Sequence, residues 1–171
     1  METFLIDKMA TPQGELLLIA DEENRLRAVD WIDHYDRLMK LLHNHYGATA
    51  FTLTEKTNPG GLSDFIQRYF AGELSMIDNL PVKTAGTDFQ HQVWKELRKI
   101  PCGETITYGE LARRINRPTA SRAVGMANRL NPISIVIPCH RVIGSQGTLT
   151  GYAGGIERKR WLLMHEGYIL A

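Results

Sequence analysis

The chain has 171 residues, of which 43% are hydrophobic and 23% are charged, as in an ordinary globular protein. This length allows one large domain or two small ones. No apolar run approaches membrane-spanning length, and the N-terminus lacks the pattern of a secretory signal, so we expect a cytoplasmic protein. The two cysteines, Cys102 and Cys139, cannot form a disulfide framework or a thiolate-rich zinc site, and no metal is predicted.

The near-neutral net charge of +1 hides an asymmetry between the two halves of the chain. Residues 1–80 carry 7 basic and 13 acidic side chains, whereas residues 81–171 carry 13 and 6. A local excess of this kind is typical of a surface that binds phosphate. For any single arginine, however, a solvated side chain is the simpler interpretation.

The first half alternates turn residues with strand-like runs. Strands are predicted over Phe4–Met9, Glu15–Ala20 and Arg25–Trp31, which together indicate an antiparallel meander. Helices are predicted over Tyr35–Tyr46 and Leu62–Phe70. The aromatic residues of the second helix recur at helical spacing, so we interpret them as core residues.

Residues 71–86 form an irregular segment in which the charge balance changes. Gly72, Pro81 and Gly86 interrupt any helical or strand pattern there. We therefore expect a linker between one domain at residues 1–82 and a second at residues 86–171.

Three helices are predicted in the next part of the chain. Thr87 is a suitable N-cap for a helix that is halted at Pro101, and Thr107 caps the next one. The third runs from about Ala120 to Arg129. The last two helices are joined by a tight break and form a helix-turn-helix candidate, although many helical hairpins look alike.

Small residues dominate the third of these helices. They are Ala120, Ser121, Ala123, Gly125 and Ala127. Glycine within a helix costs about 1 kcal/mol relative to alanine, which favours close approach of another structure. That structure is either a second helix or a nucleic-acid backbone.

Cys139 follows a run of mostly β-branched residues, Ile133–Ile137, which predicts a buried strand. Pro138 suits the first position of a helical turn, so Cys139 should lie near backbone N–H groups that favour a thiolate. Many buried cysteines are nonetheless inert. Adjacent side chains also diverge on regular elements, so His140 would need a sharp turn or a bridging water to exchange a proton with Cys139.

The end of the chain contains a glycine-rich loop and a helix. The loop spans residues 147–155, and the helix is predicted over Ile156–Glu166 and stops at Gly167. An anion such as Glu166 is unfavourable at the C-terminus of a helix. A cationic or N–H partner would relieve this; His140 is one candidate and solvent is the other.

Six short motifs in the second half resemble one known family. In chain order they are Thr107-Tyr108-Gly109, Ser121-Arg122-Ala123-Val124-Gly125, Asn131-Pro132, Pro138-Cys139-His140-Arg141-Val142-Ile143, Thr150-Gly151-Tyr152-Ala153-Gly154-Gly155 and His165-Glu166-Gly167. Together they resemble the methylated-DNA–protein-cysteine methyltransferases, which repair O6-alkylguanine, and in particular the bacterial constitutive stand-alone form. This implies an α+β protein with an N-terminal ribonuclease-H-like domain (antiparallel sheet plus helices) and a mainly helical C-terminal domain with a helix-turn-helix.

The resemblance also implies roles for individual residues. Cys139 would accept the alkyl group irreversibly, and His140 would take the thiol proton through a water. Glu166 would orient the imidazole, and Tyr108 would donate a proton or hydrogen bond to the departing base. Asn131 would brace the turn before the active-site segment. The substrate pocket would include Val142, Tyr152 and Ala153.

The implied partner is double-stranded DNA that contains O6-alkylguanine, with O4-alkylthymine as a further candidate substrate. The damaged base must be flipped out of the duplex, and Arg122 resembles the family's intercalating finger. The helix around it would bind the minor groove, mainly through phosphate. The residues expected at the DNA are Ser121, Arg122, Ala123, Gly125, Ala127 and Arg129. No cofactor, membrane association or obligate protein partner is implied, and a monomer is expected.

Two positions depart from the family pattern. Leu130 precedes Asn131 where a small or polar residue is expected, and the chain has no cysteine before Cys102 to build the N-terminal metal site of some relatives. Three other functions stay open at this point. They are a binding-only relative that recognises damage, a helix-turn-helix transcription factor, and a cysteine hydrolase.

Overall fold

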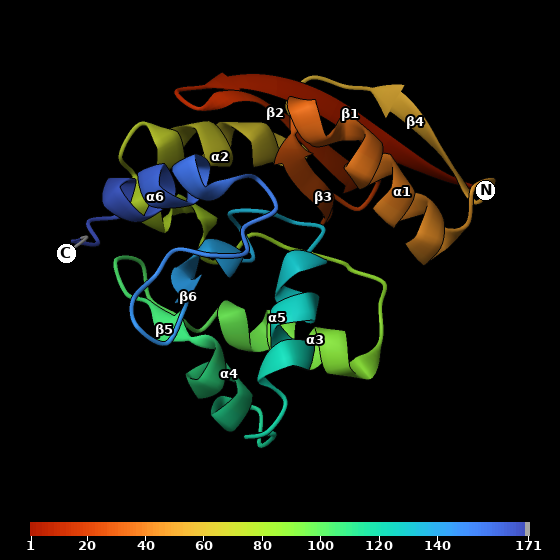
Figure 1. The fold of residues 1–171 in the computed structure, drawn as a ribbon. Coiled ribbons are helices and arrows are strands. Elements are labelled where there is room, and N and C mark those ends of the chain that lie inside the picture. Colours follow the sequence, from red (N-terminus) through yellow and green to blue (C-terminus); the bar gives the residue numbers. More distant parts are fainter. Residues whose placement is uncertain (170–171) are drawn as a thin grey trace. The chain divides into compact units, whose positions relative to one another are not determined.

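The computed structural model describes residues 1–169 of the chain (Figure 1). These residues form two compact units. The first unit comprises Met1–Ala85 together with Pro132–Val136. The second comprises Gly86–Asn131 and the chain from Ile137 onward. A two-domain division at residues 1–82 and 86–171 remains our proposal for this chain.

Within the described residues, the first unit contains a four-stranded sheet of order β3-β2-β1-β4. Strands β1 (Glu2–Thr11), β2 (Gly14–Asp21) and β3 (Leu26–Trp31) form the predicted antiparallel meander. Strand β4 (Phe51–Glu55) was not predicted, and it pairs parallel to β1. The sheet is therefore mixed and not purely antiparallel. The alternating residues of this strand are typical of a β-strand, but the run is only five residues long and its partner lies far away in the sequence.

Helix α1 (Tyr35–Tyr46) matches its prediction and covers one face of this sheet. Its Leu38 and Leu42 pack in one cluster with Phe4 and Ile19 of the sheet. Residues opposite each other in an antiparallel pair share a face, so the cluster continues across the strands.

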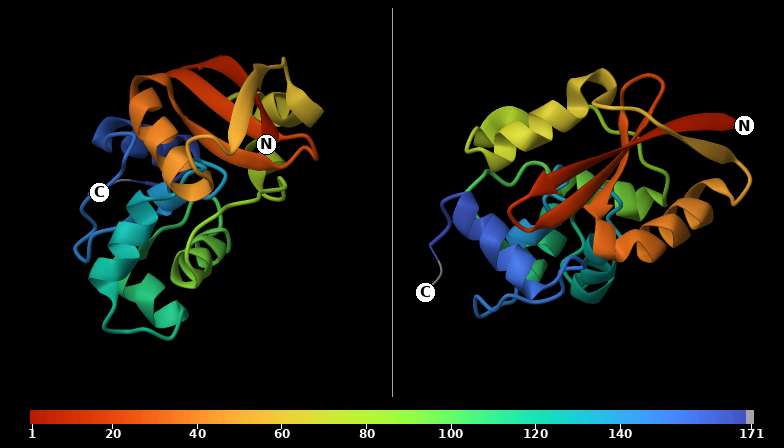
Figure 2. Two further views of the ribbon diagram at one scale, coloured as in Figure 1. Left: turned by 90° about the vertical axis from the view of Figure 1, so that its right-hand side faces the viewer. Right: turned by 90° about the horizontal axis from the view of Figure 1, so that it is seen from above.

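Helix α2 (Leu62–Phe70) also matches its prediction and covers the other face of the sheet. The ring of Phe70 meets that of Trp31 edge to face, with 6.4 Å between the centroids. The hydroxyl of Ser63 donates a 2.6 Å hydrogen bond to Asp7 of β1. In the right-hand view of Figure 2 the strands run between the two helices.

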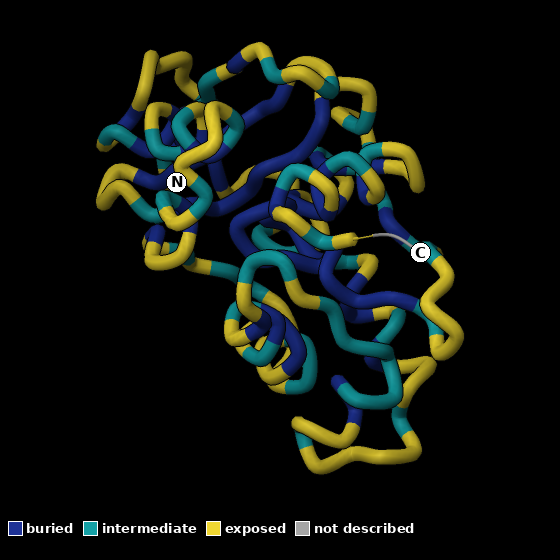
Figure 3. The backbone as a smooth tube through the Cα atoms, turned by 90° about the vertical axis from the view of Figure 1, so that its left-hand side faces the viewer, coloured by how far each residue is buried: buried dark blue, intermediate teal, exposed yellow. Residues whose placement is uncertain are grey.

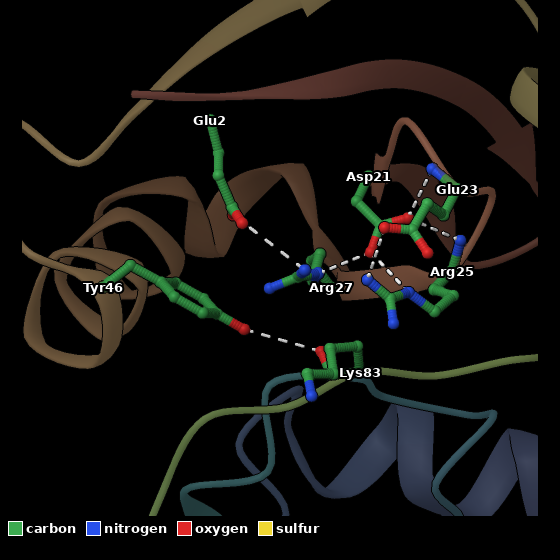
Figure 4. Close-up of polar contacts among 7 residues, drawn as sticks. All are labelled: Glu2, Asp21, Glu23, Arg25, Arg27, Tyr46 and Lys83. Atoms are coloured by element: carbon green, nitrogen blue, oxygen red, sulfur yellow. Dashed lines mark hydrogen bonds and ion pairs between the residues drawn. The ribbon is translucent and has the colours of Figure 1, made fainter.

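A buried ion cluster closes the turn after β2 (Figure 4). The Asp21 carboxylate accepts hydrogen bonds from Nε of Arg25 at 2.8 Å and Nε of Arg27 at 2.9 Å. The Arg27 guanidinium also lies over the rings of Phe4 and Tyr46, at 5.0 and 5.4 Å from their centroids. Burial alone would raise the pKa of Asp21, but hydrogen bonds from the Arg25 backbone and both guanidinium groups lower it.

The second unit is mainly helical and carries a short parallel strand pair. Its helices are α3 (Asp88–Leu97), α4 (Tyr108–Arg114), α5 (Ser121–Arg129) and α6 (Ile156–His165), and its strands are β5 (Ile106–Thr107) and β6 (Val142–Ile143). Both predicted threonine caps are confirmed. Thr87 forms a full capping box with Gln90, and the Thr107 side chain accepts the N–H of Glu110.

Residues 133–137 are buried as predicted, but the predicted strand is wrong. The segment makes only a bridge to β3: Val29 donates to the Pro132 carbonyl at 3.0 Å, and Ser134 donates to the Val29 carbonyl at 2.9 Å. It then turns, with Ile135 at a φ of 74°. A short apolar run indicates that a segment is buried on all sides, but it does not determine whether the backbone is a strand. This explains the error.

Strand β3 and most of β2 are buried, whereas most of β4 is exposed; Figure 3 colours the backbone by this burial. Short 3-10 turns complete the described chain at Ile32–His34, Pro59–Gly61, Leu74–Ile77 and Cys139–Arg141. None of the helices within residues 1–169 is long and apolar enough to cross a bilayer.

Candidate active site and nucleic-acid interface

Cys139 begins a tight 3-10 turn over Cys139–Arg141. Pro138 is the N-cap of this turn. The prediction that Pro138 would be the first residue of the turn is therefore wrong. The backbone N–H of Cys139 donates to the Ile137 carbonyl at 2.8 Å, and that of Arg141 donates to the Pro138 carbonyl at 3.0 Å. The thiol is buried, with 5% of the residue exposed. The sequence therefore forms the sharp turn that a Cys139–His140 pair requires.

Strand β6 follows this turn and ties it to the start of helix α4. Val142 pairs with Ile106, and Ile143 pairs with Thr107, in parallel register. Since Tyr108 is the first residue of α4, the pairing fixes its position relative to the Cys139 turn.

Two asparagines from the end of α5 brace the segment on either side of Pro138. Nδ2 of Asn131 donates to the Ile137 carbonyl at 2.8 Å, and Nδ2 of Asn128 donates to the Cys139 carbonyl at 3.2 Å. The first contact supports the bracing role expected of Asn131. Sequence reasoning missed Asn128, whose place on the inward face beside Val124 and Ala127 was the available signal.

Leu130 does not disturb the turn after α5. Its backbone adopts φ −90° and ψ 9°, and its N–H donates to the Met126 carbonyl at 3.0 Å. This negative φ accommodates a β-carbon, so the turn does not require glycine.

His140 and Glu166 make the contact that the sequence had indicated. Nε2 of His140 lies 2.9 Å from Oε2 of Glu166, and both side chains are fully buried. Arg141 also binds this carboxylate: its Nε and Nη2 donate to the two Glu166 oxygens at 2.9 and 3.0 Å. Its Nη1 donates to the Ile100 carbonyl at 2.7 Å. The bidentate geometry is the strong form of such a pair. Sequence reasoning placed Arg141 only within the motif around Cys139 and did not find this contact.

The protonation of this pair follows from its burial. Desolvation lowers the pKa of His140, and Glu166 offsets only part of that effect, so the imidazole is neutral at pH 7. Burial alone would raise the pKa of Glu166, but His140 and Arg141 lower it well below the ordinary range. No residue among those described hydrogen-bonds to Nδ1 of His140, which is also buried.

Lys159 is a second residue that sequence reasoning missed. It is 0% exposed, and its Nζ donates to the carbonyls of Val142 at 2.5 Å and Thr150 at 2.6 Å. Burial lowers its pKa to about 8, against the opposing influence of a negative charge on Cys139. Lysine side chains are almost never fully buried, so the sequence carried no signal for this contact.

Tyr108 donates a 3.2 Å hydrogen bond from its hydroxyl to the Thr150 carbonyl, which Lys159 also binds. Burial raises the pKa of Tyr108, with a further increase from negative charge on Cys139. A Cβ at Gly151 would lie 3.0 Å from the phenol oxygen, and φ there is +67°. Glycine at this position therefore leaves room for the hydroxyl.

A hollow of about 620 Å³ opens beside the Tyr108 hydroxyl. It is lined by Tyr108, Ser121, Arg122, Gly125, Met126, Arg129, Thr150 and Gly151. Ser121, Arg122, Ala123 and Arg129 are exposed on α5. Ala127 is only 2% exposed, and its carbonyl accepts the indole N–H of Trp94 at 2.9 Å. Ala127 was expected at the DNA, but it lies on the inward face of α5, apart from the other residues of that set.

Of the residues expected to form the substrate pocket, Tyr152 contacts His140 and Val142 contacts Lys159. Tyr152 is 7% exposed, and its ring meets the His140 ring edge to face at 6.4 Å. Val142 is fully buried and Ala153 is half-buried. Neither they nor Cys139 contributes to the lining of the open hollow. Within residues 1–169, no group of three or more His, Cys, Asp or Glu side chains is arranged to hold a metal ion.

The fold and the site define a protein with a helix-turn-helix and a buried cysteine beside a histidine–glutamate pair. Two family descriptions match the chain: "6-O-methylguanine DNA methyltransferase, ribonuclease-like domain" over residues 5–84, and "6-O-methylguanine DNA methyltransferase, DNA binding domain" over residues 88–168. The chain belongs to the methylated-DNA–protein-cysteine methyltransferase family.

Individual relatives cover almost the whole chain. Methylated-DNA–protein-cysteine methyltransferases of Shigella flexneri and Salmonella typhimurium are 58% and 56% identical over 170 residues, which is 99% of each chain. The crystal structure of Mycobacterium tuberculosis O6-methylguanine methyltransferase is 40% identical, with a TM-score of 0.78 over 95% of this chain and 92% of that one. A Mycobacterium tuberculosis OGT structure in complex with DNA is 41% identical, with a TM-score of 0.75 over 96% and 92% of the two chains. The α+β fold predicted from the sequence is confirmed.

Proposed function

We propose that this protein repairs DNA by moving the alkyl group of O6-alkylguanine directly and irreversibly to Cys139. The observation that carries the proposal is the buried His140–Glu166 pair, with Nε2 and Oε2 2.9 Å apart, directly after a buried cysteine in a tight turn. This arrangement has the order nucleophile, base and orienting carboxylate. The family to which the chain belongs performs this reaction.

In the proposed step, the sulfur of Cys139 attacks the alkyl carbon in line with the bond to guanine O6. The S–C bond forms as the C–O6 bond breaks, and the electron pair of the broken bond stays with guanine. The thiol proton passes to neutral His140, whose Nδ1 has no protein partner in the described chain, through a water. Glu166 stabilises the imidazolium and fixes its orientation.

Tyr108 protects the leaving base from carrying a negative charge. Its raised pKa keeps the phenol protonated at neutral pH, so it can donate a hydrogen bond or a proton to the base. The proton that His140 has taken up then returns through solvent to Tyr108 and restores its phenol. The net products are neutral guanine and an S-alkylcysteine. Because a thioether has no good leaving group, each molecule acts once.

Binding is proposed to place α5 in the minor groove, where Arg122 fills the space left by the flipped base. Arg122 and Arg129 line the hollow beside Tyr108 together with Gly125 and Gly151. The hollow would admit the flipped nucleotide, whose guanine edges the backbone of Cys139, Val142 and Ala153 would then read. We propose that the protein acts as a monomer and that most binding energy comes from phosphate contacts with little sequence preference.

The test uses a duplex that contains one O6-methylguanine. We expect the intact protein to gain one methyl group, and peptide mass spectrometry to place it on Cys139. Cys139→Ala should gain none and still bind the duplex. Cys102→Ser is the matched control, and it should be methylated like the wild type.

Two results would contradict the proposal. One is an unchanged protein mass while the lesion persists in the duplex. The other is a methyl group on any residue except Cys139. Sequence-specific binding that ignores the lesion would instead indicate a transcription factor, and repeated turnover of an ester or amide would indicate a hydrolase.

A further inference from the structure

Met126 is an exposed methionine on the helix that we propose to bind DNA. It is 52% exposed and lines the hollow beside Tyr108. Arg122 lies four residues before it and Arg129 three residues after it, so the three side chains share one face of α5. Both arginines line the same hollow. A flexible apolar side chain therefore lies between two cations at the edge of the hollow.

The interior of the protein does not explain this position. The core-facing apolar residues of α5 are Val124 and Ala127, which are 0% and 2% exposed. A single exposed hydrophobic residue is common on protein surfaces and needs no explanation by itself. Met164 on α6, 59% exposed, is an example that does not line the hollow. Met126 differs because it shares its face with both arginines and its hollow with Tyr108.

We propose that Met126 is a DNA-contacting residue, whose thioether packs against the deoxyribose and base edge beside the flipped nucleotide. The contact would add affinity that does not depend on salt, next to the phosphate contacts of Arg122 and Arg129. This inference rests on the proposed binding of α5 to damaged DNA. It identifies a further determinant of that binding and assigns Met126 no part in the alkyl transfer itself.

The chemistry of the minor groove fits such a side chain. Its walls are formed by sugars, which present apolar C–H groups, and proteins that bind there insert apolar residues such as methionine at unstacked base steps. Methionine is unbranched and polarisable, so it adapts to an irregular surface. Burial of the remaining apolar area of one half-exposed side chain corresponds to an affinity change on the order of tenfold.

The experiment separates apolar from ionic contacts by their salt dependence. Dissociation constants for a duplex with one O6-methylguanine are measured at several salt concentrations in the Cys139→Ala background, where no transfer occurs. We expect Met126→Gln to weaken binding about tenfold at every concentration, with the slope of log K against log salt unchanged. Arg129→Gln should reduce the magnitude of that slope by about one, because it removes one phosphate contact.

Two further variants complete the test. Met126→Leu keeps an apolar side chain of similar size and should bind like the parent. Met164→Gln removes a similarly exposed methionine from outside the hollow and should also bind like the parent. Thermal unfolding of the Met126 and Met164 variants should be unchanged, because neither methionine is buried.

The inference is overturned if Met126→Gln binds as tightly as the parent, or if it alters the salt slope as Arg129→Gln does. Failure of the proposed function has a different signature. In that case the wild-type protein gains no methyl group from the same duplex, which is measured before the Met126 variants are compared.

Discussion

Each unit of this protein has a buried carboxylate that accepts two hydrogen bonds from arginine side chains, and these two sites, at Asp21 and Glu166, serve different ends. In the first unit, Asp21 accepts hydrogen bonds from Arg25 and Arg27 at 2.8 and 2.9 Å. In the second unit, Glu166 accepts two from Arg141 at 2.9 and 3.0 Å. Each residue is 4% exposed, and in both cases the hydrogen bonds lower the carboxyl pKa despite burial.

The difference lies in the remaining partners. Asp21 also accepts the backbone N–H groups of Glu23 and Arg25, so its cluster closes the turn after β2. Glu166 instead meets His140, a neutral imidazole that follows the nucleophile in the chain. The same electrostatic arrangement thus fixes a turn in one unit and, in the other, holds the imidazole that we propose as the base. Four predictions test this comparison, from the largest expected effect to the smallest.

Glu166→Gln should reduce both stability and alkyl transfer. The substitution leaves the buried charge of Arg141 without its carboxylate, which costs about 3–5 kcal/mol of unfolding free energy. It also removes the group that orients His140, so we expect the single-turnover rate to fall on the order of 100-fold. Urea denaturation and single-turnover transfer from an O6-methylguanine duplex provide the measurements. A normal rate per folded molecule would show that Glu166 is only structural.

Asp21→Asn should reduce stability alone. We expect a loss of about 2–4 kcal/mol, because Arg27 is 5% exposed and loses its closest carboxylate. The single-turnover rate per folded molecule should match the wild type. Since the pKa of Asp21 is lowered in the folded protein, its contribution is complete above the unfolded pKa near 4 and disappears as the pH falls through the lowered value. The variant should accordingly show weaker acid destabilisation in urea titrations. A reduced transfer rate would contradict the separation of the two clusters.

Asn128→Ala should slow transfer with a modest loss of stability. The side chain donates a 3.2 Å bond to the Cys139 carbonyl, and its removal leaves that buried acceptor with only the N–H of Val142. We expect about 1–2 kcal/mol of destabilisation and a rate decrease of roughly tenfold as the turn loosens. Asn131→Ala, which releases the Ile137 carbonyl on the other side of Pro138, is the comparison variant. An unchanged rate in both variants would remove their positioning role.

The pH profile of transfer should report the lowered pKa of His140. Because burial keeps this imidazole neutral, the single-turnover rate should stay constant as the pH falls through 6.5, the ordinary pKa of histidine, and decline only below it. Glu166 raises the pKa of His140, so Glu166→Gln should move the decline further toward acid. Asp21→Asn should leave the profile in place. A decline centred at 6.5 in the wild type would contradict the assignment.

The same shift has a consequence for stability. Between pH 6.5 and the lowered pKa of folded His140, the unfolded chain binds a proton that the folded chain does not. Unfolding is therefore favoured as the pH falls through this range.

Local sequence patterns predicted much of each unit. The caps at Thr87 and Thr107 could be predicted because a cap is local: the threonine side chain accepts the backbone N–H of the residue three positions later. Strand β4 was missed because its stability comes from pairing with β1, about 50 residues away in the register of Glu2 with Phe51. The strand predicted over Ile133–Ile137 was wrong for a related reason. Its apolar residues specify burial, whereas contacts with Val29 specify its backbone.

The candidate site divides in the same way. Cys139, His140 and Glu166 were found from a motif and from the unfavourable place of an anion at a helix end. Arg141, Asn128 and Lys159 entered the site only through their contacts in the structure. Nothing in the chain near Lys159 indicates that its ammonium group is buried against the carbonyls of Val142 and Thr150.

The sequence by itself determined where the nucleophile lies, which helices begin at threonine caps, and which faces of the elements turn inward. These properties depend on residues within a turn or two of one another. The tertiary structure alone decided which charged side chains are buried and what each of them holds. Arg141 and Glu166 are 25 residues apart in the chain, and the free energy of burying each charge depends on the other being in place.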